Sequence, residues 1–259
     1  MDRHIKRTLG LILATVLQVC LAHPQDLFEF QVYDSDLVPK DGWEIDVHLI
    51  HIQKGTLLPE ESVLPTQGQS HLAIETTRGF AEEFELGSYV LFARRADGRL
   101  DYAGVRLRPR FKAPERWDLP VGVSLSFEFG WPKTRYEADP SSLEIRPIID
   151  KAIGRWRFNL NPVIARSLRG PDAGTGFEFE PSAKIDYEAS ENFLTVGIQY
   201  FGATGPLNDF LPSSQQVHIL HPNVEFALSP NTVLNIGLGI GLTDSGERLL
   251  PTVRLGFVF

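Results

Sequence analysis

The stretch that decides the fold is Val121–Trp131, which reads Val-Gly-Val-Ser-Leu-Ser-Phe-Glu-Phe-Gly-Trp. Apolar side chains occupy every second position of this stretch, and glycine or polar residues occupy the positions between them. Successive side chains of a β-strand point to opposite faces, so a period of two predicts a strand with one apolar and one polar face. A strand of about 10 residues is also long enough to cross a bilayer at a tilt.

The same alternation recurs along the rest of the chain, most clearly at 154–164, 177–188 and 234–242. These segments lack apolar residues at helical spacing, and no later segment approaches the roughly 18 consecutive apolar residues of a membrane-spanning helix. Further strands are expected to begin near Trp43, His71, Phe84, Asp101, Leu143, Leu194, Val217 and Val253. The total is about twelve, and bacterial barrels have an even number of strands.

The connections between the strands help to separate a membrane barrel from a soluble β-sandwich, whose strands also alternate. Outer-membrane barrels have long outer loops and short periplasmic turns. The predicted connections alternate in this way, with long polar segments at Gln53–Gly68, Pro132–Ser141, Ala165–Gly176 and Gly202–Gln215, and tight ones at Gly79–Glu83, Ala189–Asn192 and Ser229–Thr232. Three connections depart from the pattern, namely Ala96–Arg99, Thr243–Arg248 and Ala113–Pro120. The balance favours the barrel.

The chain ends with the alternating segment Val253–Phe259, whose last residue is aromatic. This ending resembles the C-terminal signal of outer-membrane proteins, so the barrel-assembly machinery and outer-membrane lipid are the expected partners. Trp43, Trp131 and Trp156 also stand at the ends of predicted strands. Aromatic side chains at such positions form the interfacial girdles of membrane barrels.

The N-terminus has the parts of a secretory signal peptide. Basic residues within 3–7 precede an apolar stretch at 9–21, and small residues suit cleavage after Ala22. The apolar stretch is shorter than the roughly 20 residues that span a bilayer as a helix. Lipidation of Cys20 is an alternative, although the two residues before this cysteine fit a lipoprotein signal poorly.

These boundaries predict a signal peptide at 1–22, a periplasmic N-terminal segment at 23–42 and a transmembrane β-barrel at 43–259. The segment at 23–42 contains an alternating run, Phe28–Tyr33, followed by turn residues, and is expected to form a short strand or a plug. It either caps the periplasmic mouth or enters the lumen. Both ends of the barrel are expected in the periplasm.

The bulk composition excludes some classes of partner. The net charge of −8, with a pI near 5.4, comes without a basic stripe, so no nucleic acid is expected. Cleavage after Ala22 would leave no cysteine, which excludes metal sites built on thiolates. Gly237, Gly239 and Gly241 lack the spacing of a phosphate loop and are expected to leave room for bulky side chains opposite. We expect no cofactor.

If the apolar face meets lipid, the polar face lines the lumen. The candidate lumen-lining residues are Arg106, Arg108, Glu128, Glu144, Arg146, Arg155, Arg157, Asn159, Asn161, Glu178, Glu180 and Lys184, and the same face carries Glu44, Asp46, His48, Glu75 and Arg110. One interpretation is that these groups form cross-strand ion pairs, such as Arg108 with Glu128, and brace the wall. The other is a selectivity filter in which unpaired Arg106, Arg108, Arg155 or Arg157 attracts an anionic solute.

Histidine and serine spacing gives little support for a metal site or an active site. His48 and His51 are three residues apart, as are His218 and His221, so the members of each pair lie on opposite strand faces. A metal site would need residues brought together across strands, and we predict none. A lipid hydrolase would need serine and histidine together on the outer wall, but the adjacent Ser70-His71 side chains diverge. We predict no enzymatic activity and name no catalytic residue.

Several motifs resemble an uncharacterised family of Gram-negative outer-membrane barrels. They are Glu29–Asp34, Gly42–His48, Leu143–Ile148, Phe158–Pro162 and Asn235–Thr243. More loosely, the chain is similar to barrels described as phenol-degradation-pathway or transporter-type outer-membrane proteins. The resemblance covers most of the mature chain and implies a barrel of about twelve strands in the outer membrane with an uptake role. It implies no substrate and no catalytic residue.

The sequence therefore predicts an all-β protein, a transmembrane antiparallel barrel of about twelve strands, in the outer membrane of a Gram-negative bacterium. The leading function is a narrow channel or a gated carrier for small solutes. A non-conducting structural or adhesive barrel is the alternative, followed by a membrane-embedded lipid hydrolase.

Overall fold

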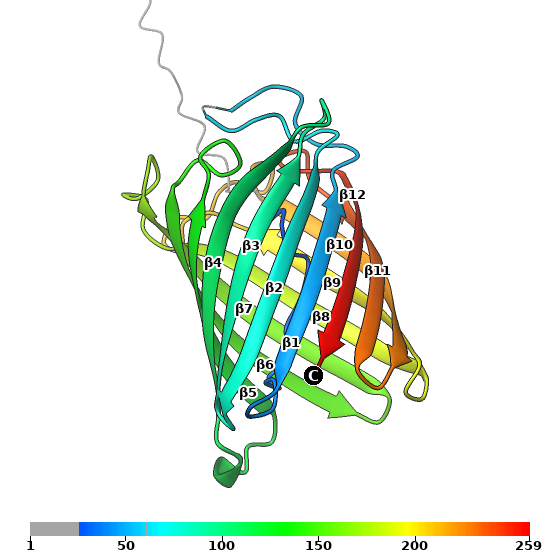
Figure 1. The fold of residues 1–259 in the computed structure, drawn as a ribbon. Coiled ribbons are helices and arrows are strands. Elements are labelled where there is room, and N and C mark those ends of the chain that lie inside the picture. Colours follow the sequence, from blue (N-terminus) through cyan, green and yellow to red (C-terminus); the bar gives the residue numbers. More distant parts are fainter. Residues whose placement is uncertain (1–25, 61) are drawn as a thin grey trace, which may run out of the picture.

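The computed structural model of the protein describes residues 26–60 and 62–259. Twelve antiparallel strands follow one another around a closed barrel, and β1 pairs with β12 to close it (Figure 1). The strands are β1 (Trp43–His51), β2 (Ser70–Ala81), β3 (Phe84–Arg94), β4 (Leu100–Lys112), β5 (Gly122–Pro132), β6 (Ser141–Ile153), β7 (Trp156–Arg169), β8 (Glu178–Ser190), β9 (Leu194–Ala203), β10 (Val217–Ser229), β11 (Thr232–Gly241) and β12 (Leu249–Val258). The predicted fold class and strand number are confirmed.

The two ends of the barrel differ. The connections at the upper end in Figure 1, here the long-loop end, include 52–69, 133–140 and 204–216. The opposite, short-turn end carries tight turns and the 3₁₀ helix Glu115–Trp117 in the β4–β5 connection. Over the described part of the chain, no helix has the length and apolar character needed to cross a membrane. By the rule for outer-membrane barrels, the short-turn end faces the periplasm.

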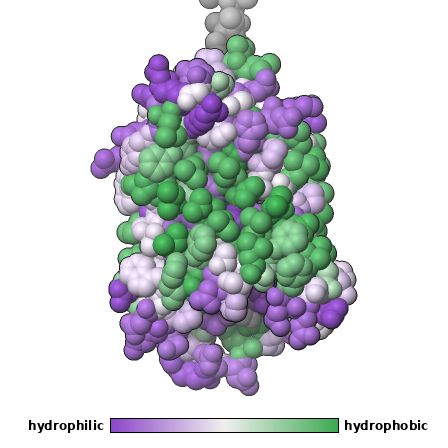
Figure 2. Space-filling model, turned by 45° about the vertical axis from the view of Figure 1, so that its right-hand side comes forward, coloured by the Kyte–Doolittle hydropathy of each residue, from purple (hydrophilic) through white to green (hydrophobic). Residues whose placement is uncertain are grey.

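The period of two places apolar side chains on the outside of the wall. Trp131, Leu160 and Ile236 are all 46–47% exposed, while the alternate residues Ser126 and Asn161 are buried inside. On the face that Figure 2 shows, apolar residues form a band across the middle of the wall, with polar surface at both ends. A closed barrel with such a belt satisfies all its ladder hydrogen bonds in lipid, because it has no edge strand.

Aromatic side chains gather near the short-turn end. The ring centroids of Phe84 and Phe111 lie 4.9 Å apart, and those of Trp156 and Tyr187 lie 4.8 Å apart. Trp43, at the start of β1, is 40% exposed, and its ring lies 5.0 Å from the guanidinium carbon of Arg78. These residues form the girdle that was expected at an interface.

Two predicted boundaries are wrong by several residues. The last strand begins at Leu249 rather than near Val253. β7 continues to Arg169, so the connection expected at 165–176 is shortened to 170–177. In β12, Pro251 and the inward-facing Leu250 hide the alternation, because the inner wall is apolar at this level.

Residues 26–38, here the plug segment, lie inside the barrel. At the long-loop end, the ring of Phe28 stacks on that of His71 at the start of β2, with centroids 4.3 Å apart. At the short-turn end, Lys40 forms a bridge with Gly79 near the end of β2. The chain therefore runs down the lumen before it enters β1, as the blue trace in Figure 1 shows.

The plug segment lies in the lumen, which is one of the two placements considered, but the short strand expected at Phe28–Tyr33 is absent, since this stretch has no regular secondary structure. The first described residues lie towards the long-loop end. The two ends of the barrel, Trp43 and Phe259, lie side by side at the short-turn end, as expected for barrel ends that share one side. The predicted signal peptide at 1–22, including Cys20, lies outside the described residues.

Apolar residues pack around the plug segment at the long-loop end. Leu27, Phe30 and Val32 join a buried cluster with wall residues from β1, β9, β10 and β12. The wall residues are Ile50, Phe201, Ala203, Val217, Ile219 and Leu250, together with Ile52 just beyond β1. The upper lumen is thus a small hydrophobic core, which gives the plug segment a fixed position.

Candidate functional site: the plugged lumen

All twelve candidate lumen residues lie on the inside of the barrel or line cavities that open into it. Those at the level of the short-turn end are Arg155, Arg157, Lys184 and Arg108. Those near the middle are Asn159, Asn161, Arg106, Glu128 and Arg146. Those towards the long-loop end are Glu144, Glu178 and Glu180. Arg155 belongs to the turn between β6 and β7 rather than to a strand.

Tyr33 anchors the plug segment to the wall at mid-lumen. Its backbone N–H donates to Oδ1 of Asn161 at 2.9 Å, and its carbonyl accepts from the side-chain amides of Asn161 at 3.1 Å and Asn159 at 3.2 Å. One step earlier, the N–H of Val32 donates to Oε1 of Gln199 at 2.8 Å. These inward-facing amides of β7 and β9 thus replace the backbone partners that a strand would have provided.

The Tyr33 side chain lies among three arginines. The guanidinium carbons of Arg108, Arg146 and Arg110 lie 4.3, 5.0 and 5.4 Å from the centre of its ring. Its hydroxyl donates to Oε1 of Glu29 and lies 3.0 Å from the hydroxyl of Tyr89. A tyrosine ring is well suited to this position, because its face attracts the cations while its hydroxyl reaches a carboxylate.

The arginines of β4 form ion pairs, but their partners differ from the predicted ones. Arg106, rather than Arg108, contacts Glu128, at 3.2 Å. Arg108 instead contacts Glu75 of β2, reaching across β3, and Arg110 contacts Glu85 at 2.8 Å. The cause is the direction of the long side chains, which project into the lumen and can pass over a neighbouring strand.

Further pairs form within strands and with the plug segment. Arg146 contacts Glu144 of the same strand at 2.7 Å, and Arg157 contacts Asp34 at 3.1 Å. Arg106 also contacts Asp26 at 2.5 Å, so the plug segment supplies carboxylates to the wall. Of the four arginines considered for an anion filter, only Arg155 forms no ion pair within the described ranges 26–60 and 62–259.

Ionisation of the plug segment's own carboxyls follows these contacts. Burial opposes ionisation of Asp26, but Arg106 outweighs it and holds the pKa of this carboxyl below its usual range. The hydrogen bond from Lys112 lowers the pKa of Asp36. Both aspartates are therefore anionic at neutral pH and attract the basic side chains of the wall.

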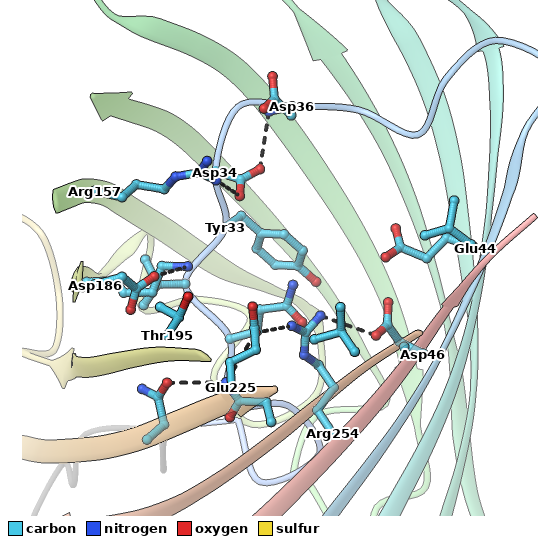
Figure 3. Close-up of a pocket in the computed structure, with 18 of the residues that line it drawn as sticks. Tyr33, Asp34, Asp36, Glu44, Asp46, Arg157, Asp186, Thr195, Glu225 and Arg254 are labelled. Atoms are coloured by element: carbon cyan, nitrogen blue, oxygen red, sulfur yellow. Dashed lines mark hydrogen bonds and ion pairs between the residues drawn. The ribbon is translucent and has the colours of Figure 1, made fainter. Parts of the chain in front are cut away.

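A cavity of about 560 Å³ opens below Tyr33 towards the short-turn end, here the vestibule. Figure 3 shows Asp34 and Arg157 facing each other, and Arg254 reaching both Glu225 and Asp46. Acidic and basic side chains alternate around this space. The vestibule is therefore wet and mixed in charge, which suits small polar solutes better than an apolar ligand.

The lumen above the plug is much narrower. A cavity of about 110 Å³, lined by Phe28, Glu128 and Glu178 among others, lies towards the long-loop end. A space of about 20 Å³ beside Glu29 and Arg146 lies between it and the vestibule. Gln31 lines both this space and the vestibule, while Glu144 lines both this space and the upper cavity. The plug segment thus leaves only a small space beside β6–β8 between the vestibule and the upper cavity.

Sequence reasoning missed the residues that close the lumen. Tyr33 and Glu29 lie in the motif Glu29–Asp34, but the motif does not indicate their partners, which are distant in sequence. Ile50 gave one available signal, because it stands in phase with Asp46 and His48 and so places an apolar group on the inner face. Apolar residues at the lumen side of a strand end indicate that something apolar fills the lumen there. The glycine prediction is confirmed, since a Cβ on Gly237 would stand 2.3 Å from the His221 ring.

The structure is similar to several solved outer-membrane barrels. The KdgM porin shares 12% identity at a TM-score of 0.53, over 83% of this chain and 99% of that chain. The COG4313 outer membrane channel from Pseudomonas putida F1 shares 11% at 0.56, over 89% and 100%. The NanC porin shares 8% at 0.54, over 83% and 98%. No protein-family model and no curated protein sequence matches the chain.

These likenesses concern the fold, because the identities are low. The closed twelve-stranded barrel, with its apolar outer wall, therefore has the fold of outer-membrane β-barrels.

Proposed function

We propose that the protein is a narrow outer-membrane channel for small polar solutes, with the plug segment as its gate. The observation that carries this proposal is the way in which the plug segment is held. Within the described part of the chain, residues 27–38 form no backbone–backbone hydrogen bond, and side chains of the wall bond their N–H and carbonyl groups instead. The segment can therefore leave the lumen without breaking the ladder of the wall.

The vestibule supports passage of small solutes of either charge. Its lining includes the acidic Asp34, Glu44 and Asp186 and the basic Arg155 and Arg157. Because most of these charges are paired, we expect weak ion selectivity rather than the strong anion preference of unpaired arginines. The proposal thus includes the interpretation that the charged side chains of the inner face pair with one another and brace the wall. Arg155, which has no such partner among the described residues, is the residue expected to give the channel any preference for anions.

Single-channel recording in a planar bilayer tests the proposal. Two refolded proteins are compared, the wild type and a variant in which residues 26–38 are replaced by a glycine-serine segment of equal length. A heat-modifiable band on an unboiled gel shows that each has assembled. We expect rare openings in the wild type and steady current in the variant, with a small reversal potential under a salt gradient.

Two results would contradict the proposal. If both assembled proteins are silent, the barrel does not conduct, and a structural or adhesive role replaces the channel. If both conduct equally, the plug segment is not the gate. If the reversal potential is large and stays large in the Arg155→Gln variant, ion selectivity is set by the wall rather than by the β6–β7 turn that carries Arg155.

One observation favours the enzymatic alternative. On the outer wall at the long-loop end, Nδ1 of His51 lies 3.0 Å from Oγ of Ser70, across the β1–β2 pair. The adjacent Ser70 and His71 diverge as expected, but the register brings a different histidine to this serine. Within 26–60 and 62–259, His51 makes no bond to a carboxylate that would orient it, so the pair lacks the third member of a hydrolytic triad. Release of fatty acid from phospholipid vesicles, lost in Ser70→Ala, would establish a hydrolase.

The direction and nature of the solute belong to the same proposal. The resemblance to phenol-degradation-pathway or transporter-type barrels implies uptake, whereas the charged vestibule favours polar solutes over an aromatic one. Swelling of proteoliposomes in isotonic solutions of small sugars, amino acids and phenol would rank these classes by rate.

A further inference from the structure

The plug segment brings a third ligand-type side chain to two that already face each other inside the wall. His48 of β1 and Glu75 of β2 lie diagonally across the strand pair, since His48 pairs with Ala73 and Asp46 pairs with Glu75. Glu29 of the plug segment approaches from the lumen. One nitrogen or oxygen from each of the three lies within 4.8 Å of the others. The exposed fractions of Glu29, His48 and Glu75 are only 4%, 2% and 3%.

Neighbouring donors orient the two carboxylates. Oε1 of Glu75 accepts from the Thr77 hydroxyl at 2.8 Å and from the Arg108 guanidinium. Oε1 of Glu29 accepts from the Tyr33 hydroxyl. In each carboxylate one oxygen is thereby fixed, and the second oxygen is left to face the gap between the three residues. Such outer contacts are what hold metal-binding side chains in place in known sites.

Two further atoms at this gap have no hydrogen-bond partner. Across the described residues, both Oε2 of Glu29 and Nε2 of His48 are buried without a bond. Nε2 of His48 lies 3.7 Å from Oε2 of Glu75, which exceeds hydrogen-bond distance. A buried carboxylate oxygen and a buried imidazole nitrogen are costly when unpaired, so two of them aimed at one gap indicate a ligand between them.

We propose that Glu29, His48 and Glu75 bind one divalent transition-metal ion of the Zn²⁺ class. An imidazole nitrogen with two carboxylate oxygens is a donor set that suits Zn²⁺, with a water in the fourth position. Ligand atoms about 2 Å from a tetrahedral ion lie about 3.3 Å apart, so the three side chains close slightly on binding. Glu75 lines the vestibule, which provides a route for the ion from the short-turn end.

The ion would join the plug segment to β1 and β2 at one point. The inference therefore goes beyond conduction and does not depend on it, because binding is measured on the assembled barrel in detergent without a current. The competing account of the same geometry is a protonated His48 that lies between two carboxylates as an imidazolium. That account predicts no metal binding.

The test is a titration of the assembled, chelator-treated and dialysed protein with ZnCl₂ by calorimetry, with CoCl₂ absorption to report geometry. We expect one ion per chain and visible d–d bands of a four-coordinate Co²⁺ site. His48→Gln should weaken Zn²⁺ binding about 100-fold or more, because even outer-shell changes cost 10- to 100-fold. The matched control is His51→Gln, on the same strand but on the outer face, which should bind as the wild type does.

Glu29→Gln separates a site that needs the plug segment from one made by the wall alone. It should weaken binding as strongly as Glu75→Gln does, while both remain heat-modifiable. The proposal is overturned if assembled wild type binds no Zn²⁺ and shows no Co²⁺ bands, or if His48→Gln binds like the wild type. The wild-type measurements stand even where a variant fails to assemble.

Discussion

Replacing Asn161 with alanine should release the plug segment from the wall. The side chain of Asn161 is fully buried and bonds Tyr33 twice, accepting from its N–H at 2.9 Å and donating to its carbonyl at 3.1 Å. After the change, Asn159 still donates to the carbonyl at 3.2 Å, but the N–H has no partner. The variant thus loses two bonds: the carbonyl keeps its second donor, whereas the buried N–H is left without a partner. The hydrogen bonds between the strands of the wall are unchanged.

The size of the effect follows from these two losses. A lost hydrogen bond of about 1 kcal/mol and a buried, unpaired N–H of about 1–3 kcal/mol together weaken docking of the segment by about 2–4 kcal/mol. Since about 1.4 kcal/mol is a factor of ten, the equilibrium between open and closed lumen shifts about 30- to 700-fold towards open. The open probability of single channels should rise accordingly until it saturates.

Two measurements on the same protein make the expectation refutable. Single-channel recording gives the open probability, and hydrogen exchange at residues 28–36 reports release of the segment. Asn208→Ala, in the exposed 204–216 connection, is the control and should change neither. Faster exchange with an unchanged open probability would show that the segment is not the gate. No change in either would show that these bonds do not hold the segment.

Three further changes test the wall and the loops, each read as the temperature at which the folded band is lost on a gel. Leu125→Asp should impair assembly, since a carboxylate on the lipid face is unfavourable, by somewhat less than the roughly 2–4 kcal/mol of a basic side chain at mid-bilayer, whereas Ser126→Asp points inward and should be tolerated. Gly237→Val should destabilise the barrel by about 1–3 kcal/mol, because a Cβ there would stand 2.3 Å from the His221 ring. Glu247→Gln should stabilise the barrel at pH 7 but not at acidic pH. Burial raises the pKa of this loop carboxyl in the folded protein. Below the pKa of the unfolded chain the carboxyl is neutral in both states and costs no stability, whereas the destabilisation develops as the pH rises through the pKa of the folded state.

Alternation was sufficient to predict the wall because each strand separates two chemically different surroundings. In β5 the apolar face meets lipid and the small polar face meets the lumen, so the pattern survives over the whole strand. The pattern fails where the lumen is itself apolar. Ile50 and Leu250 face inward, against Phe30 and Val32 of the plug segment, and no local rule distinguishes them from lipid-facing residues.

The contacts of the site were beyond prediction for a different reason. Tyr33 meets Asn161 across 128 residues of sequence, and Glu29 meets His48 and Glu75 only because the segment threads the lumen. Neither contact is signalled by a periodic pattern or a fixed spacing in the sequence. The sequence showed that charged residues line the lumen, whereas their partners depend on a segment outside the barrel ladder.

The charge pairing of the wall distinguishes a removable plug from a permanent one. If the buried arginines of the wall were paired only with carboxylates of the plug segment, departure of the segment would leave their charges unpaired. An unpaired buried charge costs several kcal/mol, so such a plug would be permanent. Four of the five arginines that face the plug segment also have a carboxylate on the wall: Arg106 has Glu128, Arg108 has Glu75, Arg110 has Glu85 and Arg146 has Glu144. The fifth, Arg157, pairs with Asp34 of the segment, and its side chain is 44% exposed in the vestibule, where water can solvate it. The β1–β12 seam is likewise complete, with Trp43 and Phe259 exchanging backbone hydrogen bonds of 2.8 and 3.1 Å. The barrel is thus closed and its buried arginines remain paired whether the segment is in or out, which is the condition that a reversible gate requires.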